Sequence, residues 1–173
     1  TQNPQPLLVE AFALVSKTFP YSTLEFCGDI KAHSSYVSDI HKRINELNIA
    51  DKVKICGETR DVQKVYETAD IFVFPSAFEG FPNALAEAMA TGLPVVAWRE
   101  CLSSAALIQD GINGFLVGDV NEAAERMALL MHDQALRLRI GCSAKDAMTL
   151  YSPKRIWDLW EELIHKALKR STV

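Results

Sequence analysis

Two glutamates, Glu79 and Glu87, stand eight positions apart in the segment FEGFPNALAEAMATGLP, and the residues between them suit the binding of an anion. An apolar run before this segment predicts a strand, and the alanine-rich run predicts a helix that opens after Pro82. The first amides of that helix, from Asn83 to Leu85, would lack partners within the helix. Because a helix N-terminus carries about half a positive charge, these amides could bind a diphosphate without a basic surface.

The two carboxylates would repel a phosphate placed beside them, so they are better suited to accept hydrogen bonds from neutral hydroxyl groups. A nucleotide sugar carries such hydroxyls on both sides of its diphosphate, on the ribose and on the sugar. Gly80 would let the backbone approach that ligand closely. We therefore expect Glu79 and Glu87 to face one cleft. The alternative for Glu87 alone is that it complements the helix dipole.

The elements that must position these residues alternate regularly along the chain. Helices are expected at 7–19, 36–47, 62–69, 83–90, 122–132, 135–148 and 153–168, and strands at 23–28, 53–56, 71–75, 94–98 and 115–117. This alternation predicts right-handed crossovers and an α/β fold, a Rossmann-like doubly wound parallel sheet flanked by helices. The run IFVFP at 71–75 is expected to be covered on both faces. Residues 1–173 are predicted to form one domain without an internal boundary.

Ligands of such sheets bind outside the carboxyl ends of the strands. The loops after Cys27, Cys56, Pro75 and Trp98 should therefore share one rim. Gly28 and Gly57 follow two of these strands, as expected for ordinary turns from strand to helix or for turns that border a ligand.

The composition argues against several other classes of protein. The net charge of −4 argues against a broad nucleic-acid-binding surface. The longest apolar runs are the length of strands, so no membrane span or anchor is expected. The four histidines lack metal-ligand spacing, and no metal site is predicted. The four cysteines form no C-x-x-C pair, and we interpret them as reduced thiols in the core, which favours the cytoplasm.

The run FPSAFEGFPNALAEAMATGLPVVA resembles the signature of the group 1 glycosyltransferases, the large family 4 of retaining enzymes with two facing Rossmann-like domains (GT-B). The segments DGINGFLV and YSPKRIWDLWEEL extend the resemblance over nearly the whole chain. It implies that residues 1–173 are the C-terminal, nucleotide-sugar-binding domain, with the N-terminal acceptor domain absent from this chain. The domain alone is then expected to be inactive, and the whole enzyme could lie at the inner membrane face through its other half.

The resemblance also implies roles for individual residues. Glu79, as the catalytic-site residue, would contact hydroxyls of the donor sugar, and Glu87 would hold the ribose hydroxyls. The residues implied to line the sugar and diphosphate are Gly80, Phe81, Pro82, Asn83 and Ala84, and those implied to border the nucleobase are Gly28, Cys56, Gly57 and Glu58.

The implied reaction transfers a sugar from a nucleoside diphosphate to an acceptor hydroxyl with retention at the anomeric carbon, without a metal or cofactor. UDP-sugar is the expected donor, with GDP next. Two positions depart from the family's pattern. The Arg and Lys usual beside the first strand are not found near that place, where this chain reads TQNPQP, so that either truncation has removed part of this site or the pair is lost. A frequent Pro-Glu pair is replaced by Ala105-Ala106.

Two alternatives remain open from the sequence. The chain could be half of a related GT-B enzyme, such as a nucleotide-sugar epimerase or a glycogen synthase-like enzyme, or a non-catalytic nucleotide-binding module. The last predicted helix also carries an apolar stripe, which we interpret as a packing surface and a hypothetical homodimer contact. The stripe consists of Ile156, Trp157, Trp160, Leu163 and Ile164.

Overall fold

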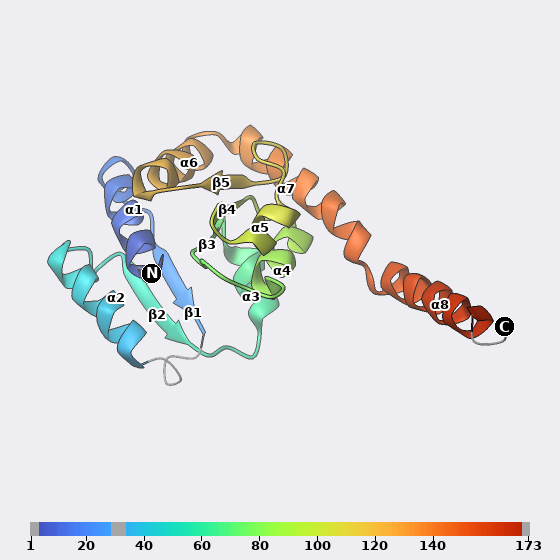
Figure 1. The fold of residues 1–173 in the computed structure, drawn as a ribbon. Helices are drawn as coiled ribbons and strands as arrows, with labels where there is room; N and C mark the ends of the chain where they lie inside the picture. Colours follow the sequence, from blue (N-terminus) through green and yellow to red (C-terminus); the bar gives the residue numbers. More distant parts are fainter. Residues whose placement is uncertain (1–3, 29–33, 171–173) are drawn as a thin grey trace.

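The computed structural model describes residues 4–28 and 34–170, which alternate between helices and parallel strands (Figure 1). The strands are β1 (Leu24–Cys27), β2 (Val53–Gly57), β3 (Phe72–Phe74), β4 (Val95–Trp98) and β5 (Phe115–Val117). The helices are α1 (Pro4–Thr18), α2 (Ser34–Glu46), α3 (Val62–Thr68), α4 (Asn83–Thr91), α5 (Leu102–Leu107), α6 (Val120–His132), α7 (Gln134–Met148) and α8 (Pro153–Arg170), with a 3₁₀ turn at Thr149–Tyr151. The predicted α/β class is confirmed.

The sheet has two parts, which the sequence did not predict. Strands β1 and β2 pair with each other, and β3, β4 and β5 form a second sheet in that order. Every pairing is parallel, with Leu24 opposite Val53 in the first sheet and Val96 opposite Phe115 in the second. The strand ends therefore form two short rims, one on each sheet.

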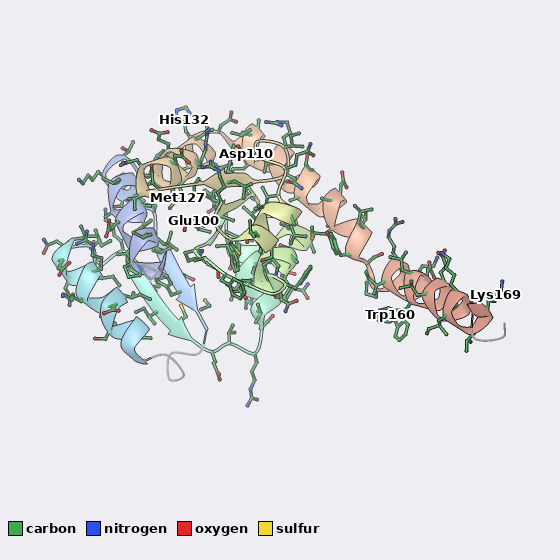
Figure 2. The ribbon with its side chains drawn as sticks, in the orientation of Figure 1. Glu100, Asp110, Met127, His132, Trp160 and Lys169 are labelled. Atoms are coloured by element: carbon green, nitrogen blue, oxygen red, sulfur yellow. The ribbon has the colours of Figure 1, made fainter. Side chains whose placement is uncertain are left out.

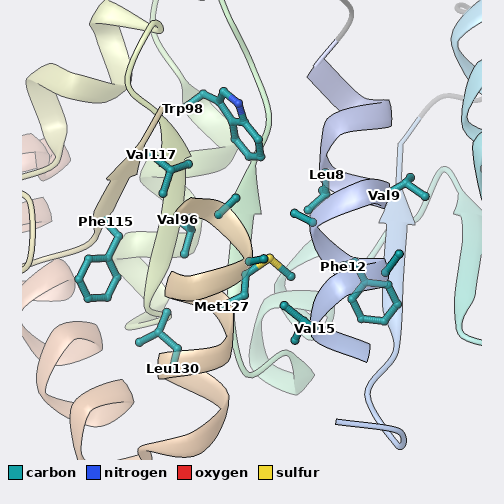
Figure 3. Close-up of a cluster of buried hydrophobic side chains, with 14 of the residues drawn as sticks. Leu8, Val9, Phe12, Val15, Val96, Trp98, Phe115, Val117, Met127 and Leu130 are labelled. Atoms are coloured by element: carbon teal, nitrogen blue, oxygen red, sulfur yellow. The ribbon is translucent and has the colours of Figure 1, made fainter. Parts of the chain in front are cut away.

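The buried strand β4 separates two hydrophobic clusters, because alternate side chains of a strand point to opposite faces. Val96 and Trp98 face α1 and α6, where they lie among Leu8, Phe12, Met127 and other side chains (Figure 3). Val95 and Ala97 face the other cluster, formed with residues of α4, α5 and α7 such as Leu85, Met89, Leu107 and Ala144. Each cluster thus fixes a helix layer against the sheet that carries the α4 loop.

Helix α4 is also held closely against α7. It ends at Gly92, whose φ of 93° lies in the left-handed region that favours glycine. A Cβ atom placed on Gly141 of α7 would collide with the carbonyl oxygen of Gly92. The close approach of the two backbones therefore depends on glycine at position 141.

One helix was not predicted, and two local predictions were wrong. The segment 102–107 forms the short helix α5, which carries too few residues to show a helical period. Strand β3 is only partly buried along Phe72 and Val73, although the run was expected to be covered on both faces. Of the four cysteines only Cys101 is buried. The others are exposed at strand ends or on the outer face of α7, so they are not core thiols.

Helix α8 extends away from the sheets, and Figure 1 shows it beyond the end of α7. Within the described chain its main neighbour is the 3₁₀ turn that precedes it. Trp157 is 73% exposed and Trp160 is 56% exposed, and Trp160 is labelled on this helix in Figure 2. The predicted apolar stripe exists, but the described residues supply no surface that covers it.

Candidate functional site

The start of α4 is the central feature of the predicted anion site. Pro82 is the N-cap residue and is fully buried, and its carbonyl accepts the first helical bond from the amide of Ala86 at 3.0 Å. The Asn83 amide donates to the carbonyl of Phe81 at 3.0 Å, so the prediction that it is available to a ligand was wrong. Among the described residues, only the next two amides of the first turn, those of positions 84 and 85, keep no backbone or side-chain partner.

Glu79 lies in the exposed loop between β3 and α4. Its carboxylate accepts a hydrogen bond from the Ser76 hydroxyl at 3.0 Å, which ties the loop to the end of β3. Its charge also reaches the Cys101 thiol at the start of α5. Burial raises the pKa of that thiol, but hydrogen bonds with Ser103 and Ser104 outweigh burial and leave the pKa below its ordinary value. The Glu79 carboxylate is therefore tied to the end of β3 and interacts electrostatically with the start of α5.

Glu87 is held by Tyr66 of α3, a residue that the sequence analysis did not single out. The Tyr66 hydroxyl donates to Glu87 Oε2 at 3.1 Å, and the carbonyl oxygen of Ala84 lies 3.3 Å away as a second acceptor. The ring packs edge-on against Phe72, with the ring centroids 5.7 Å apart. Burial, followed by the charge of Glu87, raises the pKa of Tyr66 to about 12. The hydroxyl therefore stays protonated and serves as a constant donor to the carboxylate.

A sequence signal for Tyr66 was present but incomplete. The periodicity of 62–69 places Val62, Val65, Tyr66 and Ala69 on the inner face of a short helix. It does not reveal that the hydroxyl finds its partner 21 positions later in the chain.

The residues predicted to border the nucleobase meet at the ends of β1 and β2. The Gly28 amide donates to the carbonyl of Gly57 at 2.9 Å, and Cys27 lies opposite Gly57 in the register of the two strands. Gly57 has a φ of 71°, which favours glycine. Burial raises the pKa of Cys27 to about 11, with a further contribution from the neighbouring Cys56. Cys27, Gly28 and Gly57 therefore lie together at one compact edge, and the exposed Glu58 follows Gly57 in the chain.

Two cavities divide the predicted site residues between them. A cavity of about 1170 Å³ between the two sheets is lined by Gly28, Glu58 and Ala84, together with Tyr66. A smaller one of about 420 Å³ on the other side of α4 is lined by Phe81, Asn83 and Glu87, together with Tyr151 and Ile156. Neither cavity is lined by Cys56, Gly57, Glu79, Gly80 or Pro82. Glu79 and Glu87 were expected to face one cleft. Glu87 lines the smaller cavity and Glu79 lines neither, so the two carboxylates do not share either of these cavities.

Across 4–28 and 34–170, no three His, Cys, Asp or Glu side chains cluster closely enough to hold a metal ion. In the same ranges, no helix has the length and apolar character needed to cross a bilayer.

Comparisons with known proteins agree with this architecture. Residues 2–133 match the family described as glycosyl transferases group 1. The chain is 31% identical over 165 residues to an exopolysaccharide phosphotransferase of Streptomyces coelicolor, covering 94% of this chain and 17% of that protein. It superimposes with a TM-score of 0.84 on Anabaena HepE, solved in complex with UDP, at 26% identity over 92% of this chain and 44% of the other.

A third similarity concerns the fold alone. The C-terminal domain of LpcC, a group 1 glycosyl transferase of Francisella tularensis, superimposes with a TM-score of 0.75 at 24% identity, covering 84% of this chain and 77% of that one. The fold is thus the Rossmann-like α/β domain of GT-B glycosyltransferases. The chain belongs to the group 1 glycosyltransferase family, in which it corresponds to the C-terminal domain. It spans less than half the length of the Streptomyces and Anabaena proteins.

Proposed function

We propose that this chain binds the donor of a retaining, metal-independent glycosyltransferase, which transfers a sugar from a nucleotide sugar to an acceptor hydroxyl in glycan or polysaccharide biosynthesis. UDP-sugar is the proposed donor, because the similar Anabaena protein was solved with UDP. The acceptor and the remaining catalytic groups belong to an N-terminal domain outside this chain. The exposed and free Cys27, Cys56 and Cys142 favour the reducing cytoplasm as its location.

The observation that carries this proposal is the first turn of α4. Two amides with no partner in the described chain, those of Ala84 and Leu85, open this helix at the carboxyl end of β3. Ala84 also lines the larger cavity together with Gly28 and Glu58. A diphosphate at these amides would receive charge stabilisation from the helix terminus as the sugar departs.

The carboxylates then have separate tasks in the proposed mechanism. Glu87 is already oriented by the Tyr66 hydroxyl and has acceptor capacity left for the ribose hydroxyls. Glu79, oriented by Ser76, would accept hydrogen bonds from the donor sugar. In this mechanism the leaving diphosphate oxygen takes the proton of the acceptor hydroxyl, so neither glutamate acts as a nucleophile.

Calorimetric titration with UDP, GDP and ADP tests the proposal. UDP should bind most tightly, and Glu87→Ala should weaken binding by roughly 1–3 kcal/mol, the scale of losing a hydrogen-bonding partner. Glu125→Ala is the matched control, because Glu125 is an exposed glutamate on α6, far from the α4 loop in sequence. Equal weakening by both substitutions would remove Glu87 from the site. Absence of nucleotide binding by the longer natural protein would contradict the donor-binding proposal as a whole.

A further inference from the structure

Two of the exposed thiols, Cys27 and Cys56, lie at the ends of neighbouring strands. The register of β1 and β2 pairs Glu25 with Lys54, and these two side chains form an ion pair of 2.8 Å on the exposed face of the strands. Side chains two positions apart on a strand share a face. Cys27 and Cys56 each follow the ion pair by two positions, so the strands place both thiols on that same exposed face.

An irregularity in the register brings the two cysteines opposite each other. Phe26 of β1 pairs with Ile55 of β2. The next residue of β1, Cys27, pairs with Gly57, so Cys56 and Gly57 together lie opposite Cys27. Neighbouring strands are about 4.7–4.9 Å apart, and a disulfide accepts Cα separations of about 4.4–6.8 Å. The sheet therefore provides a spacing that a disulfide between these two cysteines can bridge.

The two thiols also interact electrostatically. Burial raises the pKa of Cys27 to about 11, and the charge and hydrogen bonding of Cys56 contribute to that rise. Glu25 makes a smaller contribution in the same direction, whereas the charge of Cys56 reaches Lys54. Cys27 therefore keeps its proton near neutral pH beside an anion, while Cys56 lies beside a cation.

We propose that Cys27 and Cys56 form a redox-modification site, which a low-molecular-weight disulfide such as glutathione disulfide converts into an intrachain disulfide bond between β1 and β2. The site is independent of the proposed donor binding, because the thiols react without a nucleotide. In a reducing compartment the pair stays as two thiols, and it closes when the ratio of disulfide to thiol in the surrounding pool rises. The bond then joins the strand ends that carry Gly28 and Gly57.

Closure of this site takes two exchange steps. Cys56 loses its proton and attacks one sulfur of glutathione disulfide, so that a mixed disulfide forms and one glutathione thiolate leaves. The modified Cys56 has neither a charge nor a thiol hydrogen bond, so its contribution to the raised pKa of Cys27 disappears. Cys27 then loses its proton and attacks the Cys56 sulfur, which releases the second glutathione thiolate.

The atoms and electrons of this exchange balance. The protein loses two S–H bonds and gains one S–S bond, and the reagent loses one S–S bond and gains two S–H bonds as its thiolates take up the protons. The protein is oxidised by the same two electrons that reduce glutathione disulfide.

Peptide mapping by mass spectrometry tests this proposal. The folded chain is equilibrated with mixtures of glutathione and glutathione disulfide, its remaining thiols are blocked with N-ethylmaleimide, and it is digested with trypsin without reduction. Each of the four cysteines lies on a separate tryptic peptide, at 18–31, 55–60, 100–126 and 140–145. A link between 18–31 and 55–60 is expected in the monomeric chain, and the other two peptides should stay unlinked.

The same equilibrium in urea measures whether the sheet positions the two thiols. At one glutathione mixture, the ratio of linked to open chain should be at least about tenfold higher for the folded chain than for the unfolded chain, because the unfolded chain must first close the loop between the cysteines. An equal or lower ratio in the folded chain would overturn the proposal, since the strands would then hold the thiols in a geometry that a disulfide cannot bridge.

Serine variants identify the thiols that take part. Cys27→Ser should abolish the link and leave Cys56 as a mixed disulfide with glutathione. Cys142→Ser is the matched control, because Cys142 is an exposed cysteine on α7 outside the pair, and this variant should link as the wild type does. Thermal unfolding checks that each variant is folded. Links that instead involve Cys101 or Cys142, or that join two chains on a non-reducing gel, would contradict the assignment.

Discussion

Tyr66→Phe is the substitution that isolates how Glu87 is positioned. The variant keeps the ring that packs on Phe72 and removes only the hydroxyl that donates to Glu87 Oε2 at 3.1 Å. A hydrogen bond to a charged group contributes about 1.5–3 kcal/mol. Because Glu87 is exposed, solvent replaces part of that interaction, and about 1 kcal/mol is the expected loss in UDP binding. This loss corresponds to a dissociation constant about fivefold higher.

A double-mutant cycle with Glu87→Ala tests this reasoning by calorimetry. If the hydroxyl acts through the carboxylate, Tyr66→Phe should have little further effect once Glu87 is alanine. Full and independent losses from the two substitutions would refute the positioning role of Tyr66. Thermal unfolding of each variant is the control, since a change in binding must be separated from a change in the amount of folded protein.

The same contact has a spectroscopic signature that needs no ligand. Burial and the Glu87 charge raise the pKa of Tyr66 to about 12, so its absorbance as a phenolate should appear only in strongly alkaline solution. Glu87→Gln removes the charge and should lower that pKa, but not to its ordinary value, because burial is the larger cause. An unchanged titration in the variant would show that the two side chains do not interact.

Three other expectations concern packing, ionisation and association. Gly141→Ala should lower the free energy of unfolding in urea by about 1–3 kcal/mol, because its Cβ collides with the backbone at the end of α4, whereas Gly80→Ala meets nothing within 4 Å and should change it little. Cys27 and Cys142 are both exposed, but Cys27, with its pKa raised to about 11, should be alkylated more slowly than Cys142 at pH 8. The stability that its raised pKa contributes should be complete below pH 9, the ordinary thiol value, and be lost as the pH rises toward 11. Trp160→Glu should reduce concentration-dependent association in sedimentation, and a wild-type chain that stays monomeric at high concentration would refute a contact through α8.

Helices with a long, regular apolar periodicity could be predicted from the sequence. Features that depend on a single contact could not be predicted as well. Thirteen to eighteen residues with a regular apolar face, as in α6 and α8, predict a helix from spacing alone. The six residues of α5 are too few to define such a face. The general rule for helix N-termini predicts that the Asn83 amide has no partner within the protein. In the structure this amide donates to the nearby carbonyl of Phe81. Such a turn depends on backbone angles that residue types do not specify.

The residues predicted for the site were gathered at strand ends by the fold, but their grouping depended on packing between distant segments. Gly28 and Gly57 meet because β1 and β2 pair, which alternation along the chain anticipates. The hydrogen bond from Tyr66 to Glu87 joins α3 to α4, which β3 separates in the sequence, and no periodicity of the sequence predicts this bond. For the partly exposed strand β3, the sequence predicts more contacts than the described chain supplies. Its apolar composition predicts a neighbour on each side, and the described chain supplies only β4.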